Sequence, residues 1–340
     1  MPENTKQDKG RAYHTKCTGA ALSTVARQDK DEDITLFGSC FCPFVQRVWI
    51  AFEYLGVPYK ACCLSDCTTT NCSPGRCIFV STVSLINFDL KFLFISDIHP
   101  GTHLRDADEV NPYKKPQELL EVSPKGLVPG LRFNNYNPPR ALNESTVILE
   151  YLEDLASGTT RRSLLPPTTN PYARALVKLQ SDHVNRNLVP AFYRFLQAQD
   201  TEVQITAGKE LHQAIETLVG LLERAEREII GGGGISGDGE RQALSKGLGL
   251  WIEGGDLGWT DVMVAPWLYR ARLVLKHYRG FELPQGDKFT AWLDRLFTHL
   301  AVVATCSTDD LYLDSYERYA FNRPNTSQVA NAINSGRGLP

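Results

Sequence analysis

A cysteine followed by proline, placed where a helical pattern begins, is the feature of this sequence best suited to chemistry. Cys42 follows the strand-like segment 34–38, and Pro43 precedes a run, 44–55, with apolar residues at helical spacing. A helix N-terminus offers unpaired N–H groups and partial positive charge, which lower the pKa of a thiol. Pro43 suits the first helical position, and Arg47 adds positive charge one turn later. We predict that Cys42 is a redox-active nucleophile; a small buried thiol is the alternative.

A second cysteine lies two residues earlier, but the spacing does not make a Cys-x-x-Cys dithiol. Position 45 is valine, so Cys42 must exchange with an external thiol such as glutathione, or with Cys40 across a strained one-residue loop. We favour chemistry with a single thiol and interpret Cys40 as structural.

The elements around these residues predict two domains joined by a polar, proline-rich connection. Strand, turn, helix and a second strand starting near Val57 indicate a βαβ beginning, as in thioredoxin, and the second half of the chain has long helical patterns. Gly231 to Glu240 is predicted to be a flexible loop. The predicted divisions are a disordered tail at 1–30, a thioredoxin-like domain at 31–156, an all-helical domain at 170–321 and a tail at 322–340.

Composition excludes several classes of partner. The 340 residues include 36 basic and 39 acidic ones, a formal charge of -3, which gives no general attraction for nucleic acid or anionic lipid. The N-terminus has no secretory pattern, and the most apolar stretch, 78–95, is interrupted by Asn87, Asp89 and Lys91. We expect a cytoplasmic protein with no membrane span and no nucleic-acid partner.

Several motifs in order along the chain resemble one family. They are Phe41-Cys-Pro-Phe-Val-Gln-Arg, Gly56-Val-Pro-Tyr, Lys125-Gly-Leu-Val-Pro and Glu144-Ser-Thr-Val-Ile-Leu-Glu-Tyr-Leu. Together they resemble omega-class cytosolic glutathione transferases, of fungal type, over residues 33 to 300 apart from one interval. The resemblance implies an α/β thioredoxin-like N-terminal domain, an all-α C-terminal domain, a homodimer, and glutathione as co-substrate with no metal.

The resemblance also implies roles for residues near the thiol. Cys42 forms a mixed disulfide with glutathione, and Phe44 lies beside it. Lys115 matches a lysine that approaches the glycyl carboxylate of glutathione; an exposed lysine is the alternative. Val128 pairs through its backbone with the cysteinyl part of glutathione, and Pro129 after it is expected to be cis, with an ordinary trans turn as the alternative.

Two residues at the start of a predicted helix complete the implied glutathione site. Glu144 and Ser145 match the pair that receives the γ-glutamyl end, where a carboxylate can hold the ammonium group and a hydroxyl with helix N–H groups can hold the carboxylate. A simple helix cap is the alternative, and both readings can hold together.

The second half resembles the family more weakly, around Leu257-Gly-Trp-Thr-Asp-Val-Met-Val-Ala-Pro-Trp-Leu. Gly258 stands where a capping Ser or Thr is usual, so the hydroxyl bond is missing, whereas Asp261 still fits the cap. By resemblance Trp267 lines the pocket of the second substrate; packing in the core is the alternative.

The interval 61–107 does not fit the family. It contains five of the nine cysteines of the chain. Three of them, Cys67, Cys72 and Cys77, stand at five-residue intervals, a spacing that suits a zinc site poorly. Its second part is apolar without clean alternation. We interpret it as an insertion, and hypothesise that it is translated intervening sequence.

These observations predict an enzyme that carries out glutathione-dependent thiol–disulfide exchange or reduction, such as a thioltransferase or dehydroascorbate reductase. The acceptor is a small electrophile, an oxidant or a mixed disulfide. The alternatives are a glutathionyl-hydroquinone reductase and a non-enzymatic protein that binds partners or resembles chloride intracellular channels.

Overall fold

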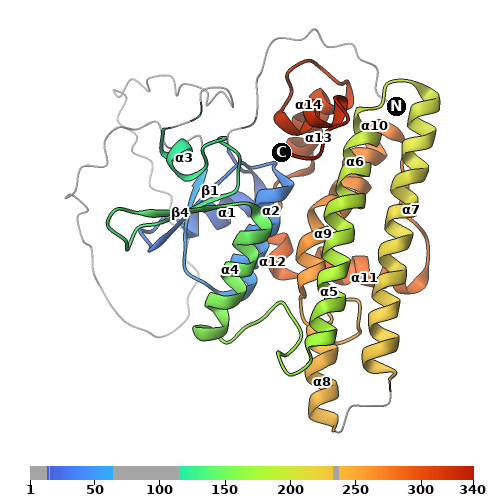
Figure 1. The fold of residues 1–340 in the computed structure, drawn as a ribbon. Coiled ribbons are helices and arrows are strands. Elements are labelled where there is room, and N and C mark those ends of the chain that lie inside the picture. The colour runs from blue at the N-terminus through green and yellow to red at the C-terminus, as the bar shows by residue number, and fades with distance from the viewer. Residues whose placement is uncertain (1–13, 15, 64–114, 116, 233–236) are drawn as a thin grey trace, which may run out of the picture.

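The computed structural model describes residues 14, 16–63, 115, 117–232 and 237–340 (Figure 1). Its first half contains a mixed four-stranded sheet in the order β2-β1-β3-β4. The central strand β1 (Ile34–Gly38) runs parallel to β2 (Lys60–Cys63) and antiparallel to β3 (Gly130–Phe133), which pairs with β4 (Arg140–Asn143).

Helices cover both faces of this sheet. Because side chains alternate along a strand, Leu36 enters the main core and Phe37 points to the opposite face. The main core includes α2 (Pro43–Leu55) and α4 (Ser145–Gly158), whereas Phe37 packs with Leu119 and Val122 of α3 (Gln117–Val122). This is the predicted thioredoxin-like arrangement.

The second half is helical, as predicted. Short π-helical segments interrupt several of its helices. The elements are α5 (Pro171–His183), η1 (Val184–Leu188), α6 (Val189–Gln197), α7 (Thr201–Ala225), η2 (Glu226–Ile230), α8 (Asp238–Gly247), α9 (Trp259–Arg270), η3 (Ala271–Leu275), α10 (Lys276–Arg279), α11 (Asp287–Thr298), α12 (Leu300–Val303) and α13 (Asp309–Ala320).

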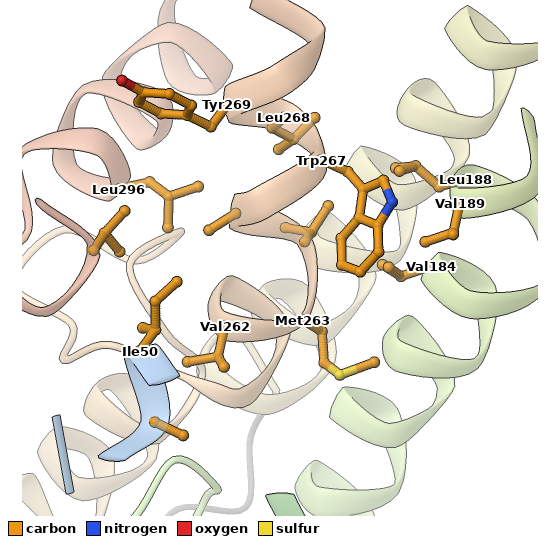
Figure 2. Packing of buried hydrophobic residues seen from close by; sticks show 14 of the residues in the cluster. Ile50, Val184, Leu188, Val189, Val262, Met263, Trp267, Leu268, Tyr269 and Leu296 are labelled. Carbon is orange, nitrogen blue, oxygen red and sulfur yellow. The ribbon is translucent and has the colours of Figure 1, made fainter. Parts of the chain in front are cut away.

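Helix α9 is buried along its whole length and packs against α2 of the first half. Trp267, in the last turn of α9, has no exposed surface and lies beside Val184, Leu188 and Val189 (Figure 2). One apolar cluster therefore joins the two halves of the described chain, and α9 fixes the position of α2 relative to the helical half.

The start of α9 is closed by a buried carboxylate rather than by a hydroxyl. Asp261 accepts hydrogen bonds from the backbone N–H groups of Gly258 (2.8 Å) and Leu250 (2.7 Å) and from the indole of Trp292 (2.8 Å). The predicted absence of a capping hydroxyl at Gly258 is thus compensated by one carboxylate that accepts from three donors.

The predicted disordered tail at 1–30 is wrong for its second part. Residues Gly19–Arg27 form helix α1, in which Ala21 and Thr24 are buried. The Ala21 N–H donates to Cys306 O (3.0 Å), and the Thr24 hydroxyl donates to Ala304 O (2.7 Å). The sequence of this segment has only weak helical periodicity. The helix is held by contacts with residues near the C-terminus, which the local sequence does not show.

The predicted tail at 322–340 is also wrong in part. Helix α14 (Gln328–Asn334) begins at Ser327, whose hydroxyl accepts a hydrogen bond from the N–H of Ala330. Gln197 donates to Ala330 O (3.2 Å), which holds α14 against the helical domain.

Two boundaries also differ from the predictions. Strand β2 extends through Cys63, so residues 61–63 do not belong to an insertion, while 64–107 lie outside the described residues. Helix α8 starts at Asp238, inside the predicted flexible loop. The cysteines Cys67, Cys72 and Cys77 lie outside the described residues as well.

Candidate active site

Cys42 lies where the chain passes from β1 into α2. It occupies the N-cap position, Pro43 is the first helical residue, and α2 ends at Gly56 in the left-handed conformation that glycine accepts readily. The Cys42 thiol makes no capping bond to the helix; it donates to the backbone carbonyl of Val128 at 3.9 Å. It remains partly exposed, whereas Cys40 is buried and donates to His14 O (3.0 Å).

The groups that favour a thiolate are present, but the effect of burial on the pKa of Cys42 is larger than theirs. Burial raises the pKa of Cys42, and the N–H groups of Val45 and Phe44, together with the charges of Arg270 and Arg47, lower it. The net direction is upward. The prediction that the helix start together with Arg47 lowers this pKa is therefore wrong, because the sequence shows the local donors and charges but not the packing around the thiol.

Arg47 is buried, and its hydrogen bonds go to residues other than Cys42. Its guanidinium is buried and donates twice to the Ser145 hydroxyl, at 3.0 and 2.5 Å, and once to the Asn185 side chain at 2.9 Å. It also lies over the rings of Phe44 and Trp267, at 5.1 and 5.3 Å from their centroids. Arg47 thus holds the hydroxyl of Ser145, the first residue of α4, by two hydrogen bonds.

The loop before β3 lies opposite the Cys42 thiol, and its backbone faces that side chain. The peptide bond between Val128 and Pro129 is cis, as the resemblance implied. Lys115 lies further along the same side of the cavity, and its ammonium donates to Lys125 O at 2.6 Å. Partial burial lowers the pKa of Lys115.

Helix α4 begins at an open N-terminus. Glu144 occupies the N-cap with no side-chain capping bond, and its backbone has φ of 69°, a conformation that is rare for residues other than glycine. Its side chain is exposed, whereas Ser145 is buried. Such backbone outliers cluster at ligand sites, and unpaired N–H groups at a helix start attract anions.

A single cavity of about 720 Å³ brings these residues together. The predicted residues that line it are Cys42, Phe44, Lys115, Val128, Pro129, Glu144 and Ser145. Trp267 does not line it. The prediction of Trp267 as a pocket residue is wrong, because Phe44 packs against its ring (5.0 Å between centroids) and separates it from the cavity, which leaves the alternative of core packing.

The helical half supplies a wall of the cavity that the sequence reasoning missed. Tyr193 comes from α6, Tyr316 and Tyr319 from α13, and the segment around α14 adds Gln328 and Val329. Burial raises the pKa of Tyr316 to about 12, so its phenol remains protonated near neutral pH. The sequence signal for this wall is the tyrosine-rich helical stretch after Asp309. That pattern does not indicate which face of the helix lines the cavity.

The described residues contain neither a cluster of metal ligands nor a membrane-spanning helix. Among them no group of three or more His, Cys, Asp or Glu side chains is arranged to hold a metal ion. None of their helices has the length and apolar character needed to cross a membrane.

Known families match the N-terminal half. Residues 36–70 and 99–155 match two family models, each described as "Glutathione S-transferase, N-terminal domain". Residues 71–98 lie between the two matched ranges. These matches cover the region that contains Cys42, Val128 and Glu144.

Curated relatives point the same way. A "Probable glutathione S-transferase GSTU1" from rice, Oryza sativa subsp. japonica, is 34% identical over 165 residues, which cover 46% of this chain and 59% of the relative. The chain therefore spans about three fifths of this relative's length. "Pyrimidodiazepine synthase" from Drosophila melanogaster is 23% identical over 300 residues, 87% of this chain and 90% of the relative.

Among solved structures, glutathione transferase Omega 3C from Trametes versicolor matches with a TM-score of 0.60 and 28% identity, covering 90% of this chain and 98% of the other. A rice transferase of 22% identity shares the fold with a TM-score of 0.54. The predicted fold class is confirmed, and residues 36–70 and 99–155 are similar to the N-terminal domain of glutathione S-transferases.

Proposed function

We propose that this chain is an omega-like glutathione transferase that reduces mixed disulfides or small oxidants with glutathione, using Cys42 as nucleophile. The observation that carries the proposal is the position of the Cys42 thiol. It lies at an open helix start, 3.9 Å from Val128 O, inside the cavity that also contains Glu144. The neighbouring omega-class structure at 28% identity supports the same reading.

The cavity offers a separate group for each part of glutathione. Backbone atoms of Val128 would pair with the cysteinyl residue, which would place the glutathione sulfur beside the Cys42 thiol. Glu144 would hold the ammonium of the γ-glutamyl end, and Ser145 with the N–H groups of α4 its carboxylate. Lys115 would approach the glycyl carboxylate.

The reaction would proceed in two exchange steps. The Cys42 thiolate attacks the glutathione sulfur of a glutathionylated substrate, a new S–S bond forms, and the substrate leaves as a thiolate that takes up a proton. A second glutathione thiolate then attacks the glutathione sulfur bound to Cys42. Oxidised glutathione leaves and Cys42 returns to its thiolate, so one reduced glutathione has been consumed and the disulfide bond has moved from the substrate to oxidised glutathione.

A second candidate activity is reduction of glutathionyl-hydroquinones by the same cysteine. The cavity wall formed by Tyr193 and Tyr316 favours it, because protonated phenols can donate hydrogen bonds to the oxygens of a hydroquinone.

The test compares Cys42→Ala with Cys40→Ala in glutathione-dependent reduction of a glutathionylated peptide and of a glutathionyl-hydroquinone. We expect Cys42→Ala to lose activity more than about a thousandfold and Cys40→Ala to keep most of it. Binding of glutathione without turnover by the unaltered chain would contradict the proposal and favour a binding or channel-like protein.

Narrower parts of the proposal concern origin, assembly and location. We propose a fungal-type, cytoplasmic homodimer. Of the predicted insertion 61–107, the part between the two matched ranges, residues 71–98, is proposed to be inserted or translated intervening sequence. Sequencing the transcript tests the last point, and a message that encodes these residues would contradict the intervening-sequence hypothesis. A shortened chain without residues 71–98 would then show whether they alter activity.

A further inference from the structure

Arg270, the last residue of α9, is a cation enclosed in the interior on the helical side of the thiol. It has no exposed surface. Its guanidinium donates to Gln46 Oε1 (2.6 Å), Pro266 O (2.8 Å) and Phe41 O (2.9 Å). Phe41 immediately precedes Cys42, so this contact ties the helical half to the peptide group that leads into the reactive residue.

The remaining contacts of Arg270 are aromatic. Its guanidinium lies over the ring of Tyr312 at 4.6 Å and over that of Tyr316 at 5.6 Å. Its Nε has no hydrogen-bond partner. Within the described part of the chain no carboxylate forms an ion pair with it. A buried cation held only by carbonyls and rings is costly, and it gains most from an anion that forms nearby.

We propose that Arg270 is a positioning residue that fixes the Phe41–Cys42 segment and supplies the counter-charge for the Cys42 thiolate. The inference rests on the proposed function only in taking Cys42 as the nucleophile. Among the charges that lower the pKa of Cys42, that of Arg270 has the larger effect and that of Arg47 the smaller. Arg47 also has the Ser145 hydroxyl and Asn185 as close acceptors.

Other titratable and charged groups also face the thiol or its cavity. Tyr193 and Tyr316 lie on the helical side, and Tyr319 lines the same wall. His14, Lys115, Lys125 and Glu144 line the cavity from the remaining sides. Of the groups that act on Cys42 directly, Arg47 and Arg270 are the cations, so removal of Arg270 leaves Arg47 as the remaining positive charge.

The test is the pH dependence of Cys42 alkylation by iodoacetamide in the full chain, followed by peptide mapping because the chain has nine cysteines. For Arg270→Met we expect the midpoint to rise by about one pH unit, so that alkylation at pH 7 slows about tenfold. Arg270→Lys keeps the charge and should stay within about 0.3 unit of the unaltered chain.

Arg279 provides a matched control. It is a partly buried arginine whose guanidinium donates to backbone carbonyls, those of Phe195, Leu196, Tyr278 and Ala320. The charges that lower the pKa of Cys42 are those of Arg270 and Arg47. Arg279→Met should lower Tm without moving the midpoint. Equal midpoint shifts in Arg279→Met and Arg270→Met would overturn the proposal, because they would reflect general loss of packing.

A second variant keeps the proposal testable if Arg270→Met does not fold. Gln46→Glu places a carboxylate on the atom that already accepts from Arg270, so it neutralises the guanidinium without removing it. We expect the midpoint to rise as for Arg270→Met, and an unchanged midpoint in folded Gln46→Glu would refute the inference. Alkylation needs no glutathione, so this result is independent of whether the proposed turnover is observed.

Discussion

Helices α2 and α9 pack against each other in the core, yet their N-termini are built in opposite ways. At α9 the carboxylate of Asp261 is buried and accepts three hydrogen bonds, one of them from the N–H of the N-cap residue Gly258, and we call this a closed start. At α2 the N-cap is Cys42, whose thiol makes no capping bond and faces the cavity. Helix α4 resembles α2, because Glu144 at its N-cap also makes no capping bond.

The difference distinguishes a helix start that stabilises the fold from helix starts that can take part in binding and catalysis. A closed start satisfies backbone donors within the protein and stabilises the fold, whereas an open start leaves donors available to an anion. Two open starts meet in one cavity, and the closed one lies behind it in the core. Substitutions at the closed start should therefore change the free energy of unfolding, and those at the open starts should change kinetics.

The largest stability effect is expected at the closed start of α9. Asp261→Ala strands three buried donors, each of which costs about 1 to 3 kcal/mol, so we expect a loss of about 3 kcal/mol or more. Urea denaturation measures it, with Asp261→Asn as a control that keeps an acceptor and should lose less. If Asp261→Ala lowers the free energy of unfolding by less than about 1 kcal/mol, the closed helix start does not stabilise the fold more than the open ones.

The next effect is kinetic and concerns the open start of α4. Glu144→Gln removes the charge offered to the ammonium of glutathione, so we expect KM for glutathione to rise about tenfold or more, with an unchanged Tm. The matched control is Glu150→Gln on the same helix, where the carboxylate pairs at the surface with Lys178. Similar KM values for both variants would show that Glu144 does not bind glutathione.

The smallest effect tests why glycine stands at the N-cap of α9. A Cβ at Gly258 would lie 2.7 Å from the Cα of Gly249, so Gly258→Ser gains a hydroxyl cap but collides with backbone. We expect a net loss of about 1 kcal/mol, because strain of about 1 to 3 kcal/mol exceeds the gain from the cap.

Gly286, at the N-cap of α11, is the control for that substitution. The nearest atom to a Cβ there is the Cβ of Phe289 at 4.0 Å, so Gly286→Ser has room and should be neutral or slightly stabilising. A stabilised Gly258→Ser would show that Gly249 moves aside and that the close approach is not a constraint.

The residues that line the N-terminal half of the cavity could be named from the sequence, because they belong to short motifs; their roles toward glutathione stay predictions. Cys42-Pro43 at a helix start, Val128-Pro129 and Glu144-Ser145 each combine a residue type with a recognisable backbone position, and the structure brings them to one cavity. The helical wall could not be predicted in this way. Tyr193 and Tyr316 reach the cavity only through the packing of α6 and α13.

The errors have the same origin. The family motif predicted that Trp267 lines the cavity, but Phe44 packs against its ring. Helical spacing in the sequence does not show which side chain lies between Trp267 and the cavity. The raised pKa of Cys42 and the interior position of Arg270 depend on burial by segments far along the chain. Helix α1 was missed because its partners are residues 304–308.

The most direct test of the central claim is the site at which oxidised glutathione modifies the protein. Incubation followed by digestion and mass mapping should place a glutathione adduct on Cys42, with release of one reduced glutathione, and added glutathione should remove it. The Cys42→Ala chain should carry no adduct at that peptide, whereas Cys40→Ala should react normally. An adduct found on Cys306 or Cys40, with Cys42 unmodified, would contradict the account.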